Sequence, residues 1–284
     1  MKNSNIYLGI DIGTVSLKVA AVPDDASHQI FSQINPGSSF SYHPSHNSTP
    51  LPILINNYQR IKGNPVETAY QVLQQLFSIL PADSVKGMRI CGSGAKLVGD
   101  ILNVKVENEF RAIAHAVGLL YPHISTVFEM GGQNAKFMTL ISGETTPQIG
   151  IQDYEKSGDC AAGTGSFLDQ QASRLKYRIE EIGDIVSKAE RSAKIAGRCS
   201  VFAKSDMIHA QQKGFQPSEV FKGLCEAVAR NFKSSIVKGK SFDKPVLFIG
   251  GVASNRGVVE ALKLVFNLDD SELMVPDFHA WMGA

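Results

Sequence analysis

Two cysteines in glycine-rich or helix-start contexts are the residues of this sequence best suited to chemistry. Cys160 opens the run C-A-A-G-T-G-S-F, which has the composition of a phosphate-binding turn at the start of a helix. Cys199 stands just before a second expected helix start at residues 201–206. Helix N-termini present free N–H groups and a positive dipole end, which favour phosphate and also favour thiolate over thiol. The pattern therefore predicts a nucleotide contact and a metal or redox ligand within one short stretch.

A glycine turn near the N-terminus offers a second phosphate contact. Residues 11–16 read D-I-G-T-V-S, where Gly13 permits a tight turn that directs the N–H groups of Thr14 and Val15 toward phosphate oxygens. Asp11 is suited to position Mg²⁺ or a water molecule, because magnesium prefers a few carboxylates together with waters. An ordinary hairpin with a surface turn would explain the same residues.

A related turn, E-M-G-G-Q-N, occupies residues 129–134. Glu129 is predicted to hold a metal-bound or attacking water and Gln133 to orient it, as glutamines do in other nucleotide hydrolases. Glu109 begins an expected helix and is predicted to approach the γ-phosphate, although the helix dipole alone accounts for a carboxylate there. The candidate catalytic residues are Asp11, Glu129, Gln133 and Glu109.

A third turn, G-G-V-A-S-N at residues 250–255, follows a buried strand and precedes a helix. The carboxyl ends of strands are where α/β sheets bind ligands, so a purine or ribose is expected to lie against the glycine backbone. A plain connecting loop is the alternative. The residues predicted to contact the nucleotide are Gly13, Thr14, Val15, Ser16, Lys18, Gly131, Gly132, Gly163, Thr164, Gly165, Gly250, Gly251, Ser254 and Asn255.

The two acid-x-glycine turns lie in hairpins of the same plan. Residues 6–22 and 126–141 each read as a strand, a turn and a second strand. Aligning Asp11 with Glu129 also aligns Gly13 with Gly131 and Lys18 with Lys136. A repeated hairpin that opens each half predicts two related α/β lobes facing a cleft, unless the similarity is chance.

Helical and strand patterns alternate between and after these hairpins, which indicates an α/β fold. The Ser-, Pro-, His- and Asn-rich residues 32–52 are expected to form a surface loop or insertion without a packed core of their own. An N-terminal lobe is predicted for residues 1–122, completed by residues 270–284, and a C-terminal lobe for residues 123–269. Helices are expected at 64–80, 109–120, 167–175, 218–237 and 256–266, and strands at 85–90 and 245–249.

Composition limits the class of protein. The 284 residues carry a formal net charge of +1, so no basic field for nucleic acid is expected. The sequence contains no apolar run of about 18 residues that would span a membrane. Four cysteines are too few for a disulfide framework, which favours a reducing compartment and a cytoplasmic protein. Cys91, at a strand end, and Cys225, on an apolar helix face, are expected to be core residues.

Taken together, the motifs resemble the ATPase superfamily that unites actin, sugar kinases and heat-shock chaperone ATPases. Within it, the sequence is most similar to the activators of 2-hydroxyacyl-CoA dehydratases and the related ATPase subunits of benzoyl-CoA reductase. The resemblance implies a two-lobed actin-like (ribonuclease H-like) ATPase fold with a central nucleotide cleft. It rests on residues 9–14, 63–68, 129–133, 160–165, 199–203 and 250–255, and the two cysteines narrow it to this family.

The resemblance also implies cofactors and partners. Members of the family bind ATP or ADP with Mg²⁺ and are homodimers that share one 4Fe–4S cluster, to which each subunit contributes two cysteines. Carried over by position, Cys160 and Cys199 would be these ligands. A small ferredoxin- or flavodoxin-like carrier would supply the electron. ATP hydrolysis would then drive its low-potential transfer to an acyl-CoA dehydratase or reductase.

Some features depart from the family pattern. Asn134 stands where the family usually carries a carboxylate, which puts hydrolytic turnover in question. Residues 278–284 read as the first turn of a helix cut short, and with the 32–52 insertion they resemble the first module of a large multidomain activator. Two other functions stay open: a sugar or acid kinase of the same superfamily, and a nucleotide-binding regulatory module without turnover.

Overall fold

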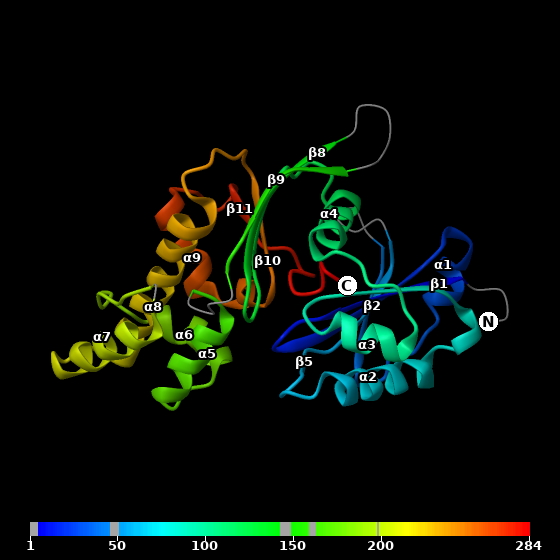
Figure 1. The fold of residues 1–284 in the computed structure, drawn as a ribbon, viewed down its shortest axis with the longest axis horizontal. Coiled ribbons are helices and arrows are strands. Elements are labelled where there is room, and N and C mark those ends of the chain that lie inside the picture. The colour runs from blue at the N-terminus through cyan, green and yellow to red at the C-terminus, as the bar shows by residue number, and fades with distance from the viewer. Residues whose placement is uncertain (1–4, 46–50, 143–148, 159–162, 198) are drawn as a thin grey trace. The chain divides into compact units, whose positions relative to one another are not determined.

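The computed structural model describes residues 5–45, 51–142, 149–158, 163–197 and 199–284. The chain forms two compact units, each of which is described by itself (Figure 1). Within the described residues, no helix has both the length and the apolar character needed to cross a membrane. The first unit takes the described residues of Met1–His123, Ser142–Ile149 and Ala280–Ala284, and the second those of Ile124–Ile141 and Gly150–His279.

The first unit is built on a mixed sheet in the order β3-β4-β2-β1-β6, with β5 paired to β2. Side chains alternate along β1, so Leu8 and Ile10 are buried while Tyr7 is exposed. The strands are β1 (Ile6–Ile12), β2 (Ser16–Pro23), β3 (Phe40–His43), β4 (Ile53–Asn56), β5 (Gln59–Arg60) and β6 (Val85–Cys91). The helices are α1 (His28–Phe31), α2 (Pro65–Ile79), α3 (Ala95–Leu102) and α4 (Glu109–Leu120).

Helix α2 shows how the sequence sets an element boundary. The side chain of Asn64 accepts a hydrogen bond from the N–H of Glu67 at 3.3 Å, and Pro65 fills the first helical position. Val72, Leu76 and other apolar residues at helical spacing are buried against the sheet. The predicted helix at 64–80 is therefore confirmed, as is the one at 109–120, which α4 matches.

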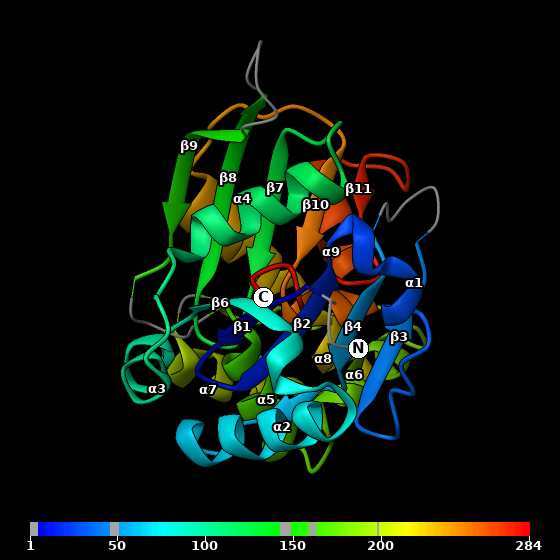
Figure 2. The ribbon, with the colours of Figure 1, turned by 90° about the vertical axis from the view of Figure 1, so that its right-hand side faces the viewer.

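The second unit has a five-stranded sheet among its described residues, in the order β11-β10-β7-β8-β9. Figure 2 shows β9, β8, β7 and β10 side by side in that order. The strands are β7 (Thr126–Met130), β8 (Ala135–Ser142), β9 (Ile149–Lys156), β10 (Val246–Ile249) and β11 (Leu273–Met274). The helices are α5 (Gly165–Arg174), α6 (Ile182–Val186), α7 (Ser200–Gln212), α8 (Pro217–Phe232) and α9 (Arg256–Phe266).

Both sheets repeat one arrangement. In the first, β1 pairs antiparallel with β2 and parallel with β6, and in the second, β7 pairs antiparallel with β8 and parallel with β10. The register places Asp11 opposite Lys18 and Glu129 opposite Lys136. The prediction of two related α/β lobes is confirmed, down to the residue alignment of the two hairpins.

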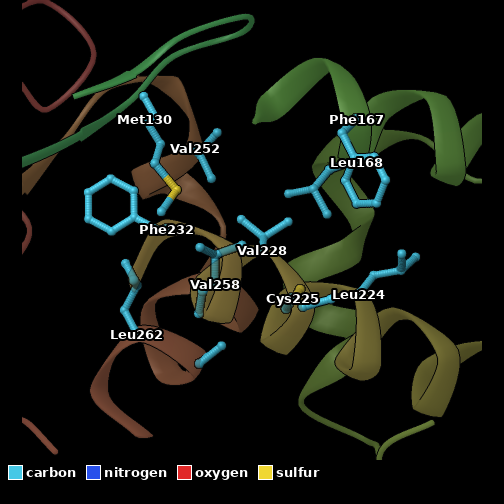
Figure 3. Close-up of a cluster of buried hydrophobic side chains, with 14 of the residues drawn as sticks. Met130, Phe167, Leu168, Leu224, Cys225, Val228, Phe232, Val252, Val258 and Leu262 are labelled. Carbon is cyan, nitrogen blue, oxygen red and sulfur yellow. The ribbon is translucent and has the colours of Figure 1, made fainter. Parts of the chain in front are cut away.

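The core of the second unit is rich in aromatic residues. Phe128 is fully buried, and its ring centroid lies 5.0 Å from those of Phe232 and Phe266 and 5.3 Å from that of Phe242. Figure 3 shows neighbouring side chains of α5, α8 and α9 turned toward one another around Val228. This core fixes α8 against α9, the helix that directly follows the Gly250 turn.

One prediction on the first unit holds only in part. Residues 32–52 were expected to form a surface loop or insertion without a packed core of their own, but they include β3, which pairs antiparallel with β4 at the edge of the sheet, and Ile34 and Phe40 are buried in the core of the first unit. Isolated apolar residues among Ser, Pro and Asn give no clear strand pattern, yet an edge strand needs only one buried face. Residues 46–50 of this segment lie outside the described residues.

The C-terminal residues also differ from expectation. The segment from residue 270 was predicted to complete the first lobe, but β11 pairs parallel with β10, so the chain stays in the second unit as far as His279. Only Ala280–Ala284 joins the first unit, where the Nε1–H of Trp281 donates to Oδ1 of the buried Asn56 at 3.0 Å. Residues 277–283 form consecutive turns rather than the start of a helix.

Candidate nucleotide site

The Asp11 turn of the first unit is closed by its own backbone. The N–H of Gly13 donates to the carbonyl of Ser16 at 3.1 Å, and Nζ of Lys18 lies 3.2 Å from Oδ2 of Asp11. Both side chains of this ion pair are mostly buried. Thr14 is exposed at the tip, as a phosphate contact requires, whereas Ser16 is buried within β2. The turn therefore presents a carboxylate that already carries a countercharge.

The Glu129 turn of the second unit has the same construction. The N–H of Gly131 donates to the carbonyl of Asn134 at 2.8 Å, and Nζ of Lys136 lies 2.8 Å from Oε2 of Glu129. The side chains of Glu129 and Lys136 are less than a tenth exposed. A buried carboxylate is costly without such a partner, and the lysine at this spacing supplies one.

Each acid lies beside a glycine that directly follows the parallel neighbour of its own strand, β6 in the first unit and β10 in the second. Gly92 and Gly250 both have left-handed φ angles, +98° and +91°. A Cβ atom at Gly92 would come within 2.4 Å of the Ile12 carbonyl oxygen, and one at Gly250 within 2.3 Å of the equivalent oxygen of Met130. Only glycine permits these approaches. The repeat thus includes a third loop that sequence reasoning recognised in only one of the two halves.

Ser93 is a candidate phosphate contact that sequence reasoning missed. Its hydroxyl lies 3.1 Å from that of Thr14, because the turn after β6 docks on the Asp11 turn through the N–H of Gly94 and the carbonyl of Ile12. The signal was present in the sequence as a G-S-G run shortly after the strand predicted at 85–90. Its meaning depends on the parallel pairing of β6 with β1, which places Cys91 beside Asp11.

The Gly163–Gly165 turn packs directly on the Glu129 turn. The N–H of Gly165 donates to the carbonyl of Gly131 at 3.0 Å, and that of Ser166 to the carbonyl of Gly132 at 2.7 Å. The buried hydroxyl of Thr164 donates to the same Gly132 carbonyl at 2.9 Å. The N–H groups of Gly165 and Ser166 are therefore used to dock the helix start on the glycine turn, and the nucleotide contact predicted for Gly163, Thr164 and Gly165 stays a prediction.

The Gly250 turn completes a group of three adjoining turns in the second unit. A Cβ atom at Gly250 would lie 2.9 Å from Oε1 of Glu129, and one at Gly165 would lie 3.2 Å from Cγ2 of Val252. Among the described residues, no atom lies within 4 Å of a Cβ built on Gly251, so its backbone faces open space. The structure therefore brings together three of the motifs that the sequence assigned to nucleotide binding.

Comparison with known proteins identifies the family of this chain. The model of the BadF/BadG/BcrA/BcrD ATPase family matches residues 8–283. The chain belongs to this ATPase family. The 2-hydroxyisocaproyl-CoA dehydratase activator of Clostridioides difficile is 29% identical over 216 residues, which cover 75% of this chain and 77% of that protein. The activator of lactoyl-CoA dehydratase from Anaerotignum propionicum is 34% identical over 157 residues, which cover 55% of this chain and 58% of the relative.

Solved structures of family relatives share the fold. The Clostridium difficile activator of 2-hydroxyisocaproyl-CoA dehydratase with bound ADPNP superposes with a TM-score of 0.75 at 25% identity, over 98% of this chain and 91% of its own. Component A of the Acidaminococcus fermentans (R)-2-hydroxyglutaryl-CoA dehydratase gives a TM-score of 0.73 at 22% identity, over 98% and 94%. With the duplicated sheets, these matches confirm the predicted two-lobed, actin-like α/β fold.

The Gly250 turn has a feature that fits the nucleotide which this ATPase family uses. Oδ1 of Asn255 caps α9 by accepting from the N–H groups of Gly257 and Val258. Its Nδ2 is buried and finds no acceptor among the described residues, although a buried donor is costly to leave unpaired. A ligand acceptor beside the open backbone of Gly251 would satisfy it. Ser254, the other predicted anchor, uses its hydroxyl to bond the carbonyl of Gly251.

The remaining predicted site residues are less constrained. Glu109 is the first residue of α4, where Asn108 caps the helix by accepting from the N–H groups of Phe110 and Arg111. That position agrees with the helix-dipole alternative, and its approach to phosphate stays a prediction. Gln133 is half-buried in the Glu129 turn, at a position suited to the predicted orienting role.

The two cysteines predicted as cluster ligands differ in whether they belong to the described residues. Cys160 lies outside them, whereas Cys199 is half-buried directly before α7. No cluster of three or more His, Cys, Asp or Glu suited to a metal occurs in the described part of the chain. Cys91 and Cys225 are buried as predicted, and burial raises the pKa of the Cys225 thiol to about 12, which keeps it protonated.

The segments next to the two cysteines rest on one face of α8. A Cβ at Gly163, three residues after Cys160, would lie 2.3 Å from Nδ2 of Asn231. A Cβ at Gly197, two residues before Cys199, would lie 2.3 Å from the carbonyl oxygen of Ala227. Ala227 and Asn231 are four residues apart on the helix and therefore neighbours on its surface. The two segments are thus held one helical turn apart.

His279 is bonded to the Gly250 turn through both its backbone and its ring. The N–H of Gly250 donates to the His279 carbonyl at 2.7 Å, and Nδ1 of the ring lies 3.1 Å from the Gly250 carbonyl oxygen. Burial lowers the pKa of His279 below its usual value, so acidification protonates the unfolded chain before the folded one. We expect the free energy of unfolding to fall as the pH drops below about 6.5, the ordinary pKa of histidine.

Urea unfolding at a series of pH values checks this expectation. His279→Asn keeps a hydrogen-bonding side chain and removes the titration, so its stability should fall less between neutral and mildly acidic pH. His115→Asn, at an exposed histidine of α4, is the control and should behave as the wild type does. An unchanged pH dependence in His279→Asn would contradict the role of the ring.

Proposed function

We propose that the chain is an ATP-dependent activator that couples hydrolysis of Mg-ATP to the delivery of a low-potential electron to an acyl-CoA dehydratase or reductase. The observation that carries the proposal is the double attachment of the Gly163 segment. At Gly165 the segment starts α5, which is docked on the Glu129 turn. At Gly163, three residues after Cys160 in the sequence, it contacts α8. A change at the nucleotide turns therefore has a short route to a candidate cysteine ligand.

The nucleotide chemistry is assigned to the paired acids. Asp11 and Glu129 would hold the magnesium ion or the attacking water, and Gln133 would orient that water. Lys18 and Lys136 lie within ion-pair distance of these acids and would compensate phosphate charge as the nucleotide enters. The exposed hydroxyl of Thr14 and the open backbone of Gly251 supply contacts to the phosphates and the purine. The proposal therefore includes hydrolysis, although Asn134 stands where the family usually carries a carboxylate.

The cysteines are assigned to an iron–sulfur cluster shared by two copies of the chain. A 4Fe–4S cluster takes four thiolates, so Cys160 and Cys199 would suffice only across a two-fold axis. Val201 and Phe202, which begin α7 beside Cys199, are 67% and 66% exposed. Large apolar side chains at this exposure fit a surface that a second copy covers. When bound, the cluster supplies a one-electron carrier of low potential.

The partners follow from the relatives. Those relatives are named as activators of dehydratases that act on 2-hydroxyisocaproyl-CoA and lactoyl-CoA, so we assign the electron acceptor to the acyl-CoA dehydratase or reductase class. A small ferredoxin- or flavodoxin-like protein is proposed as donor, and the cytoplasm as location. Differential affinity for ATP and ADP would shift the second unit between two arrangements of the turns.

Anaerobic iron and sulfide analysis, with the mass in solution, tests this function. The wild type should be a dimer with about two iron atoms per chain, since two chains share four. Cys199→Ser should lose its iron while its ATP affinity stays within about tenfold, because the nucleotide turns lie elsewhere. The matched control Cys225→Ala removes a buried core thiol and should keep the iron.

Three results would contradict the proposal. An iron-free wild-type monomer that phosphorylates a sugar or an organic acid would make the protein a kinase. Iron retained at the wild-type level by Cys199→Ser would remove the assigned ligand. A protein that binds ATP but shows no hydrolysis, with or without iron, would be a regulatory module instead.

A further inference from the structure

The segment before Cys199 lies along α8 as an extended strap. We define the α8 strap as residues 189–197. The carbonyl of Ala189 accepts from Nζ of Lys222 at 3.2 Å, and the N–H of Ala193 donates to the carbonyl of Glu219 at 3.0 Å. The strap therefore follows the helix from near its start toward the Gly163 segment.

Two glycines let the strap approach the helix closely. A Cβ at Gly223 of α8 would lie 2.0 Å from the Ala193 carbonyl oxygen, and one at Gly197 of the strap 2.3 Å from the Ala227 carbonyl oxygen. Real Cβ atoms are excluded at such distances, so backbone meets backbone at both points. Gly223 and Ala227 share one face of α8, because they are four residues apart.

Polar side chains of the same face hold the far end of the strap. Arg230 donates from Nη2 to the Ile195 carbonyl at 3.2 Å and from Nη1 to Oε2 of Glu226 at 3.4 Å. The same Glu226 oxygen accepts from the hydroxyl of Ser192 at 3.0 Å. Arg230 is thus the one described side chain that joins this carboxylate to the strap backbone near Gly197.

These bonds border a hollow beside the strap. Strap and helix line this hollow of about 660 Å³, which includes Lys194, Glu226, Arg230 and Asn231. Ala193 and Ile195 of the strap are buried in the core, whereas the bonds of Arg230 hold the strap on the side of the hollow, where apolar packing does not continue. Asp206 of α7 accepts from the N–H of Ala196 at 2.8 Å, which ties the strap to the helix that follows Cys199.

The opposite side of α8 faces the nucleotide turns through α9. A Cβ at Gly257 would lie 3.0 Å from Sγ of Cys225, and Figure 3 shows Val228 of α8 beside Val258 of α9. Helix α9 begins directly after Asn255, whose buried Nδ2 finds no acceptor among the described residues. Helix α8 therefore contacts the helix of the nucleotide turn on one side and both cysteine-bearing segments on the other.

We propose that Arg230 is a positioning residue that sets where Cys199 lies relative to the Gly163 segment, and that α8 transmits the nucleotide state to it. The inference rests on the proposed function for its purpose. Its geometry rests on the contacts of Arg230 with Ile195 and Glu226. Breaking these contacts removes neither cysteine and alters none of the nucleotide turns, but it frees the strap next to Cys199.

Alkylation of Cys199 in the metal-free protein tests the proposal without the cluster. The rate of modification by iodoacetamide, followed by mass spectrometry of the Cys199 peptide, should rise about fivefold in Arg230→Met, because one net hydrogen bond no longer closes the strap. In the wild type the rate should differ between MgADP and the magnesium complex of ADPNP, and in Arg230→Met this difference should disappear. Arg230→Lys should restore part of both effects.

Controls separate this proposal from the proposed function. Arg178→Met replaces an arginine of the same unit whose side chain is 77% exposed, and it should alkylate as the wild type does. Equal rates in wild type and Arg230→Met, with native circular dichroism in both, would overturn the proposal even if iron is bound. A wild type that never binds iron but shows these alkylation changes would refute the cluster and leave the role of Arg230 standing.

Discussion

Replacement of Asp11 by asparagine is expected to lower the steady-state ATPase rate about a hundredfold or more, the usual effect of removing a charged group from a phosphoryl-transfer site. The amide keeps the shape of the carboxylate and can still accept a hydrogen bond from Lys18, which lies 3.2 Å from Oδ2. What it loses is the negative charge that would hold magnesium. The assay is phosphate release from Mg-ATP by anaerobically purified protein.

The control for this variant is Asp83→Asn, at an exposed aspartate of the same unit. It should keep the wild-type rate. Thermal unfolding of Asp11→Asn must be measured in parallel, because a mostly buried lysine loses its countercharge in this variant. A folded Asp11→Asn protein that hydrolyses ATP within about threefold of the wild-type rate would show that the acid of the first hairpin has no catalytic part.

Phe128→Ala is expected to lower the free energy of unfolding by about 3–5 kcal/mol, as deletion of a fully buried aromatic ring does. Its ring lies between 5.0 and 6.0 Å from four other phenylalanine rings, so the surroundings cannot collapse into the space without losing their own contacts. Urea unfolding followed by circular dichroism measures the change.

Leu264→Ala provides the comparison for Phe128→Ala. Leu264 lies on α9 and is 71% exposed, so its truncation should change the free energy of unfolding by less than about 0.5 kcal/mol. A loss below about 1 kcal/mol in Phe128→Ala would mean that the aromatic cluster is not the core of the second unit.

The sequence alone was enough to predict the repeated hairpins. Apolar alternation and the acid-x-glycine turns predicted both strands of each hairpin and the alignment of one hairpin with the other, which the equivalent pairing of Asp11 with Lys18 and of Glu129 with Lys136 confirms. Helix boundaries with a cap, such as Asn64 before α2, were equally readable. These features are local, because the residues that determine them lie within a few positions of one another.

Features that depend on distant residues were not predicted. Ser93 beside Thr14 follows from the pairing of β6 with β1, and the docked N–H groups of Gly165 and Ser166 follow from the packing of α5 on the Glu129 turn. The α8 strap carries neither helical nor strand periodicity, so no pattern marked it. The glycines at 197 and 223 permit its close approach to α8, and their purpose appears only when the helix beside them is known.

The lysines beside the two acids bear on how a divalent ion would arrive. Asp11 and Glu129 each lie in a pair that is electrically balanced before any ligand is present. A bare cation would have to compete with an ammonium group already in place, so it gains little by entering alone. A triphosphate that brings its own magnesium would offer the lysines a new partner, and the carboxylates would then be released to bind the metal. Metal and nucleotide would be taken up as one complex, and the resting protein would have weak affinity for free Mg²⁺ and for nucleotide without metal.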